Sequence, residues 1–290
     1  MRSTAGAAPG GASAPLGVFD SGLGGLTVVR ALLETVPDER IVYLGDTARV
    51  PYGTRSPDTV ARYARGCAQT LIDRGVKALV VACNTVSAVA VDLLRAEFDV
   101  PVLGVVEPGA RTAVLAMEAL EARPGVLRIG VLGTAGTVAS GAYPRAVRQL
   151  TARYEVVAEA APLLVPLVEE GWTEGEVPRL IVERYVAPLI RAGASVIVLG
   201  CTHYPLLAPL IAQVAQELAG RPIPVVDSAA ATADAVRDSI AEGSIERAPA
   251  GRAFDLELFV TDRPQSFISV AQRFLGRDVP AVRQIDLLPG

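Results

Sequence analysis

The 290-residue sequence is poor in the side chains on which much enzyme chemistry depends: it has one histidine, one lysine and three cysteines. Lys77 opens a predicted strand, at the end opposite to Cys83, so no lysine is available at that strand's carboxyl end for a Schiff base with pyridoxal phosphate. A single histidine excludes an HExxH motif and any two-histidine metal site. Three cysteines without close spacing do not form a disulfide framework, so we expect free thiols in a reducing compartment.

Long apolar runs and basic clusters are missing too. Gly, Arg, Asp or Glu interrupts every apolar run before the roughly 18 to 20 residues needed to cross a bilayer. The formal net charge is −4 and no basic run is interleaved with aromatic residues, so we expect neither nucleic acid nor a membrane among the partners. Residues 1–15 lack the apolar segment of a signal peptide, and we expect a disordered tail on a cytoplasmic protein.

Short apolar runs bounded by turn residues alternate along the chain with longer segments that have apolar residues at helical spacing. This alternation predicts an α/β fold of parallel strands and right-handed crossovers, with helices on both faces of the sheet. The predicted strands are 16–19, 41–44, 78–82, 102–106, 127–132, 154–158, 196–199 and 223–226, with a further strand within 254–261. The predicted helices are 26–35, 57–74, 86–98, 109–120, 139–150, 177–192 and 205–218.

A weak internal repeat divides the chain. Segments 17–22 (GVFDSG) and 130–135 (GVLGTA) open the two halves, and a cysteine follows each at a similar distance. The repeat predicts two similar parallel-sheet α/β lobes related by pseudo-two-fold symmetry, with the active site in the cleft between them. With boundaries near Thr112 and Arg221, we expect a tail (1–15), a first lobe (16–112 plus 222–290) and a second lobe (113–221).

Two cysteines end apolar runs, in VVACNT (80–85) and VLGCTH (198–203). Such a run delivers a thiol to the carboxyl edge of a sheet, where open α/β folds bind their ligands. Removing a proton from a carbon beside a carboxylate and returning one to the opposite face needs a base and an acid. Cys83 and Cys201 would meet that need if one were a thiolate and the other a thiol. The N-terminus of a helix would lower the pKa of a thiol from its ordinary value of about 8.5. The competing interpretation is a buried, inert thiol, which we expect for Cys67 in helix 57–74.

Other polar residues follow predicted strands at the same edge. The Gly-rich segment 20–25 (DSGLGG) lacks both GxGxxG and a P-loop lysine, so it does not predict a nucleotide site. His203 either relays the proton of Cys201 or is structural. Segment 51–53 (PYG) is either an ordinary loop or a substrate-facing one, and Glu169 is either a solvated helix end or a functional group. The hydroxyl and amide side chains, which serve either as helix caps or as ligand contacts, are Asn84, Thr85, Thr134 and Thr202.

Taken together, seven segments resemble the cofactor-independent aspartate/glutamate racemase family, and within it the glutamate racemases. The segments are FDSGLGGLTV (19–28), YLGDT (43–47), PYG (51–53), ACNT (82–85), GVVEPGA (104–110), PLLVP (162–166) and LGCTHYPL (199–206). Departures are modest: Val86-Ser87 replaces a frequent Ala-Thr, and Ala161 stands where Cys is common.

The resemblance implies a homodimeric cytoplasmic enzyme that interconverts L- and D-glutamate without cofactor or metal and supplies D-glutamate for peptidoglycan. It implies that Cys83 and Cys201 carry the proton, from D- and L-glutamate respectively, with Asp20, Glu169 and His203 as auxiliary catalytic groups. The substrate-binding residues expected with it are Asp20, Ser21, Pro51, Tyr52, Gly53, Asn84, Thr85, Thr134, Thr202 and His203.

Two other functions stay open at this point. One is an aspartate racemase, or another two-cysteine member of the same superfamily. The other is a two-lobed binding module for small carboxylates, with thiols that are structural or hold a metal. Cys83, Cys201 and His203 would be a poor zinc site because they lack close spacing, and thiolates bound to a metal could not shuttle protons.

Overall fold

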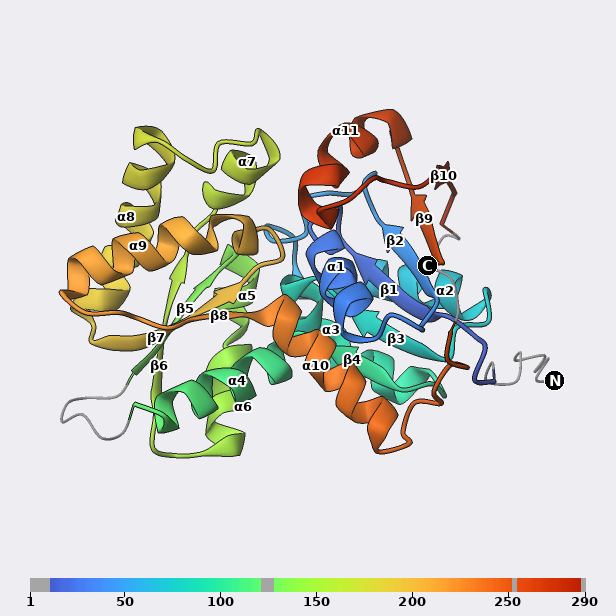
Figure 1. Cartoon of the computed structure of the whole chain (residues 1–290), viewed down its shortest axis with the longest axis horizontal. Helices are drawn as coiled ribbons and strands as arrows, with labels where there is room; N and C mark the ends of the chain where they lie inside the picture. Colours follow the sequence, from blue (N-terminus) through green and yellow to red (C-terminus); the bar gives the residue numbers. More distant parts are fainter. Residues whose placement is uncertain (1–10, 121–127, 252–254, 288–290) are drawn as a thin grey trace.

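Two parallel sheets lie side by side in the computed structural model, which describes residues 11–120, 128–251 and 255–287 (Figure 1). The first sheet has the strand order β10-β9-β2-β1-β3-β4. Its strands are β1 (Leu16–Asp20), β2 (Ile41–Gly45), β3 (Ala78–Val81), β4 (Val102–Gly104), β9 (Leu256–Val260) and β10 (Val282–Gln284). The second sheet has the order β6-β5-β7-β8. Its strands are β5 (Arg128–Gly133), β6 (Glu155–Ala160), β7 (Ala194–Gly200) and β8 (Val225–Asp227).

The two sheets share one topology. The first four strands of each half occur in the same order, β2-β1-β3-β4 and β6-β5-β7-β8, and every pairing is parallel. The α/β class and the two-lobed fold predicted from the sequence are therefore confirmed. Because β3 and β7 hold equivalent places, the residues that follow them reach equivalent edges of the two sheets.

Helices cover both faces of each sheet. They are α1 (Leu26–Thr35), α2 (Pro57–Ile72), α3 (Asn84–Glu97), α4 (Val106–Glu118), α5 (Ala135–Ser140), α6 (Ala142–Leu150), α7 (Leu164–Glu169), α8 (Glu176–Arg191), α9 (Ala208–Ala219), α10 (Ser228–Ala241) and α11 (Pro264–Leu275), with a 3₁₀ turn at Tyr204–Leu207. Within the described ranges, every helix is too short or too polar to cross a membrane.

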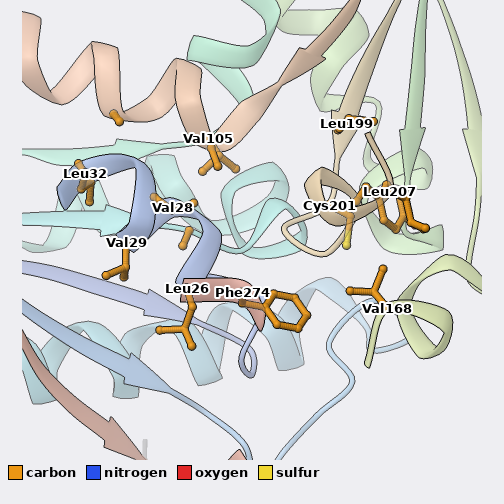
Figure 2. Packing of buried hydrophobic residues seen from close by; sticks show 14 of the residues in the cluster. Leu26, Val28, Val29, Leu32, Val105, Val168, Leu199, Cys201, Leu207 and Phe274 are labelled. Atoms are coloured by element: carbon orange, nitrogen blue, oxygen red, sulfur yellow. The ribbon is translucent and has the colours of Figure 1, made fainter. Parts of the chain in front are cut away.

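The central strands are buried on both faces, which explains why their sequences read as continuous apolar runs. In the first lobe, α2 and α3 pack on one face and α1, α10 and α11 on the other. The second of these layers continues without a break into the second lobe. One cluster joins Leu26 and Phe274 of the first lobe to Leu199 and Leu207 of the second (Figure 2). Burial of shared apolar surface thus holds the lobes together.

Several element boundaries differ from the sequence-based prediction. The predicted strand 102–106 ends at Gly104, and α4 begins at Val106. The predicted helix 139–150 corresponds to α6, which begins at Ala142 because Gly141 ends the preceding α5. Helices α10 and α11 were not predicted, and of α7 only a helix end at Glu169 was considered. The Ala-rich sequence of α10 has only a weak apolar period, so the pattern did not separate it from a loop.

The chain returns to the first sheet later than predicted. The predicted boundary at Thr112 falls inside α4, which connects the two sheets. The boundary at Arg221 precedes β8, and β8 still pairs with β7 in the second sheet. The return therefore follows residue 227, because α10 packs against α1 and α4 and provides the crossing. The division of the chain into lobes at single residues stays a prediction.

Lys77 does not face the carboxyl edge of the sheet; it makes a buried ion pair at the opposite end of β3. Its Nζ lies 2.6 Å from Glu39 Oε2, and both side chains are 3% exposed. The same ammonium donates to the carbonyls of Ala12 and Glu246 at 3.0 and 2.6 Å. Residues 11–15 of the predicted disordered tail are thus anchored in a turn, whereas residues 1–10 lie outside the described residues.

Replacing Lys77 with Met should lower the free energy of unfolding by about 3 to 5 kcal/mol, because it leaves the Glu39 carboxylate buried without a counter-charge. Urea denaturation measures the loss. The double variant Lys77→Met/Glu39→Leu removes that uncompensated charge and should recover at least half of it. A loss in the single variant no larger than in the double variant would contradict this account.

Candidate functional site

The two thiols lie at the carboxyl ends of equivalent strands, Cys83 after β3 and Cys201 after β7. Both are nearly enclosed, with 6% and 5% of their surface exposed. Cys83 is the N-cap of α3, and its carbonyl accepts the N–H of Ser87 at 2.8 Å. Cys201 precedes a turn and a short 3₁₀ segment rather than an α-helix, so the predicted helix N-terminus is present at only one of the two thiols.

The surroundings of Cys83 favour its neutral form. Its Sγ donates to Ser21 Oγ at 3.5 Å. Burial raises the pKa of Cys83 to about 12, and the negative charges of Asp20 and of an ionised Cys201 act in the same direction. In the protein without ligand, Cys83 is therefore a thiol.

Asp20 ends β1 beside Cys83 and is 2% exposed. Its Oδ2 accepts the N–H of Gly22 at 3.0 Å, whereas its Oδ1 is buried with no hydrogen-bond partner among the described residues. Burial raises the pKa of Asp20, opposed by the charge of His203 and by backbone N–H groups of the Gly-rich segment. An unsatisfied buried acceptor is costly, so Oδ1 is suited to a donor supplied by a ligand.

Cys201 has a different partner set. Its Sγ lies 3.9 Å from His203 Nδ1, and His203 Nε2 lies 3.0 Å from Glu169 Oε1. Burial alone lowers the pKa of His203, but the hydrogen bonds to Cys201 and Glu169 outweigh it and raise that pKa to about 10. A protonated imidazole beside a thiol stabilises the thiolate. Glu169 is thus part of a His–carboxylate pair rather than only a solvated helix end.

Two threonines from opposite lobes meet beside the thiols. Thr85, in the first turn of α3, has its Oγ1 2.9 Å from Oγ1 of Thr134, the N-cap of α5. Thr134 also bonds Thr137, at 3.0 Å between hydroxyl oxygens. The backbone N–H of Thr137 donates to the Thr134 hydroxyl at 3.2 Å, which is the contact expected three residues after a capping threonine. The hydroxyl groups form one polar cluster that spans the lobes.

Asn84 and Thr202 are buried at the same level as the thiols. The Asn84 amide accepts the hydroxyl of Tyr143 at 2.8 Å and donates to Ser228 Oγ at 3.5 Å. The backbone carbonyl of Thr202 accepts the Thr27 hydroxyl at 3.0 Å, another contact between the lobes. The structure therefore brings both residues to the predicted edge, with Asn84 held through its side chain and Thr202 through its backbone.

The loop around Tyr52 contacts the second lobe through its backbone. The ring of Tyr52 is buried and its hydroxyl donates to Asp46, which also accepts from Arg49 at 2.6 Å and from Thr261 at 2.9 Å. The Gly53 carbonyl accepts the N–H of Gly136 in the second lobe at 2.9 Å. Pro51 is exposed and follows a cis peptide bond.

This anchoring role of Asp46 was not predicted, although the residue directly follows β2 at the site edge. From there its carboxylate anchors the loop around Tyr52 through the tyrosine hydroxyl.

A surface hollow lies away from this cluster. It has a volume of about 690 Å³, lies between α4, α6 and α10, and none of the predicted site residues lines it. Within the described part of the chain, no group of three or more His, Cys, Asp and Glu side chains is arranged to hold a metal ion, and this includes Cys83, Cys201 and His203.

The single histidine makes the His203–Glu169 pair directly testable. Replacing Glu169 with Gln removes one of the two interactions that raise the pKa of His203, so the pKa should fall from about 10 toward the ordinary value near 6.5. The imidazole proton resonances, which are the only ones from histidine in the chain, follow the titration without assignment. Glu170→Gln is the matched control, and an unchanged midpoint in Glu169→Gln would refute the coupling.

The same shift has a consequence for stability. The pKa of His203 is higher in the folded protein than in the unfolded chain, so its protonation stabilises the fold fully below about pH 6.5 and ceases to do so as the pH rises through about 10. The unfolding free energy of the natural protein should therefore exceed that of Glu169→Gln more at low pH than at high pH. Denaturant titrations across this pH range measure the difference in unfolding free energy between the two proteins. A difference that increases with pH would contradict the prediction.

Comparison with known proteins agrees with this geometry. Residues 16–236 match the family model described as Asp/Glu/Hydantoin racemase. The glutamate racemase of Geobacter metallireducens is 46% identical over 272 residues, 94% of this chain and 96% of the relative. That of Aquifex aeolicus is 45% identical over 265 residues, 91% and 95% of the two chains.

Solved structures give the same result. Glutamate racemase from Thermus thermophilus in complex with β-chloro-D-alanine has a TM-score of 0.81 at 43% identity, covering 96% of this chain and 98% of the other. The Francisella tularensis enzyme in complex with D-glutamate has a TM-score of 0.83 at 31% identity, covering 94% and 98%. The resemblance inferred from the sequence motifs is thus confirmed, and the chain belongs to the Asp/Glu/Hydantoin racemase family.

Proposed function

We propose that the protein is a glutamate racemase that moves the Cα proton between two thiols without a cofactor. The observation that carries the proposal is the placement of Cys83 and Cys201 at equivalent strand ends of two lobes, each with its own acid–base partners. A symmetric pair of proton carriers suits a reaction whose substrate and product are mirror images at one carbon. The similarity to glutamate racemases over nearly the whole chain supports the choice of substrate.

In the proposed reaction from L-glutamate, the Cys201 thiolate removes the Cα proton and the Cys83 thiol donates its own proton to the opposite face. Protonated His203 stabilises the Cys201 thiolate before the step. Cys83 becomes a thiolate as it gives up its proton. The reaction from D-glutamate runs through the same groups in reverse, so each direction returns the thiols to the state from which the other begins.

The remaining polar groups fit the three charges of glutamate. The unpartnered Oδ1 of Asp20 is suited to the substrate ammonium. The hydroxyl groups of Thr85 and Thr134 and the backbone of Tyr52 and Gly53 offer neutral donors for carboxylates. Because both thiols are nearly enclosed, we infer that glutamate enters when the lobes separate and reacts after they close, in a site from which water is excluded.

Circular dichroism of L-glutamate with the purified protein and no added cofactor tests the proposal. The signal should decay to zero with the natural protein, whereas Cys83→Ser and Cys201→Ser should each lower the rate by at least about 10³-fold, because each removes a proton carrier. Cys67→Ser is a control for the loss of a thiol as such, since Cys67 is a buried free cysteine in α2 and is not one of the two proposed proton carriers. A flat signal with the natural protein, or full turnover by either site variant, would overturn the proposal.

The rates with L-glutamate and L-aspartate show which of the two amino acids is the substrate. With L-glutamate and L-aspartate at equal concentration, we expect kcat/KM to be at least about 100-fold higher for glutamate, because a shorter chain leaves donors for the distal carboxylate unpaired. The same dichroism assay provides both values. A preference for aspartate would assign the chain to the aspartate-specific branch of the family.

We also propose that the enzyme is a cytoplasmic homodimer whose D-glutamate enters peptidoglycan. The support is the family resemblance carried by the motifs around both thiols. Sedimentation equilibrium tests the dimer, and D-glutamate auxotrophy after deletion in the source bacterium tests the cellular role. A monomer at micromolar concentration, or growth of the deletion strain without D-glutamate, would contradict the respective part.

A further inference from the structure

Helix α11, near the end of the chain, packs directly against the acid–base pair beside Cys201. It belongs to the first lobe, where it packs on α1. The ring of its fully buried Phe274 lies 5.2 Å from the His203 ring, measured between centroids, with an interplanar angle of 81°. This is an edge-to-face contact. Figure 2 shows Phe274 pointing toward the segment that carries Cys201 and toward Val168 of α7.

The preceding residue of the same helix holds the other member of the pair. Arg273 Nη2 donates to the backbone carbonyl of Glu169, at the end of α7, at 2.6 Å. Gly171, two residues farther, has φ +78°, and a Cβ on it would collide with the Arg273 guanidinium. The left-handed backbone favours glycine at residue 171, and a side chain there would displace the Arg273 guanidinium. Figure 1 shows α7 and α11 at the same end of the molecule, on facing sides of the two lobes.

These contacts restrain the orientations of His203 and Glu169. The imidazole of His203 must present Nδ1 to Cys201 while Nε2 stays on Glu169, which fixes the plane of the ring. The edge-to-face contact with Phe274 opposes rotation of that plane. The bond from Arg273 fixes the backbone from which the half-exposed Glu169 side chain extends.

We propose that Arg273 and Phe274 are positioning residues, which hold the Glu169–His203 pair aligned on Cys201. The proposal rests on the proposed racemase function. Both contacts cross from the first lobe to the second, so alignment of His203 depends on closure of the lobes. The described polar and ring contacts of both residues go to the Cys201 side, whereas the hydrogen-bond partner of Cys83 is Ser21. Loss of the contacts should therefore weaken proton transfer at Cys201 more than at Cys83.

Racemisation uses both thiols in either direction and does not separate these effects, but a one-base reaction does. From glutamate with chlorine at Cβ, one thiolate removes the Cα proton. The Cα–H electron pair forms the Cα–Cβ double bond, and chloride leaves with the C–Cl pair. The resulting enamine reacts with water to give 2-oxoglutarate and ammonium. Release of 2-oxoglutarate from the L and D compounds therefore reports on Cys201 and Cys83 separately.

The test variant is Arg273→Met, which keeps an unbranched stem on an exposed residue and removes the guanidinium; Gln272→Met is the matched control on the same helix. Arg273→Met should lower elimination from the L compound about ten- to a hundredfold, as expected of a small misplacement, and leave the D compound within about twofold. Phe274→Leu should act in the same direction, and Gln272→Met should match the natural protein with both compounds.

The outcomes separate the two proposals. If Arg273→Met and Phe274→Leu lower elimination from both compounds equally, or from neither, α11 has only a structural role and the inference is overturned. If the natural protein neither racemises glutamate nor eliminates chloride from either compound, the proposed function itself fails. A selective loss with the L compound, in a natural background that processes both, supports the positioning role.

Discussion

The close approach of the Gly24 backbone to Thr202 and His203 is the contact on which the geometry of the site depends. A Cβ at Gly24 would overlap the Thr202 hydroxyl and lie 2.5 Å from His203 Nδ1, so only glycine lets the two lobes meet here. Thr27, in the first turn of the following helix, donates its hydroxyl to the Thr202 carbonyl and fixes the same approach. These contacts join the loop after β1 to the turn that follows Cys201.

The environments of the two thiols differ although the lobes share a topology. Cys83 has a carboxylate neighbour and a helix N-terminus, and burial dominates its pKa. Cys201 has an imidazole whose protonation is stabilised by Glu169. The first arrangement favours a neutral thiol, and the second places a cationic imidazole beside the sulfur. The two lobes therefore share a topology, whereas the neighbours of their thiols differ in charge.

Burial of the site strengthens the electrostatic effects of Asp20 and His203. The site is surrounded by strands buried on both faces and by an apolar layer that runs unbroken through both lobes. In such surroundings the unpartnered Oδ1 of Asp20 and the protonated His203 act with little screening by water. The same layer includes Phe274, so the packing that stabilises the contact between the lobes also touches the acid–base machinery.

The sequence by itself determined the parallel α/β class, the internal repeat and the placement of Cys83 and Cys201 at strand ends. These follow from local patterns, since an apolar run and the residues directly after it fix where a strand ends. The polar residues beside those strand ends, from Asp20 to His203, were identified for the same reason.

The tertiary structure alone decided what these residues contact. The partners of Glu169, the anchoring of Tyr52 by Asp46 and the contacts of Arg273 and Phe274 join segments far apart in the chain. The tertiary structure also decided which sheet contains β8, because its pairing with β7 places it in the second sheet. Local periodicity predicts which face of an element is apolar, but the neighbour that covers that face is chosen only when the whole chain packs.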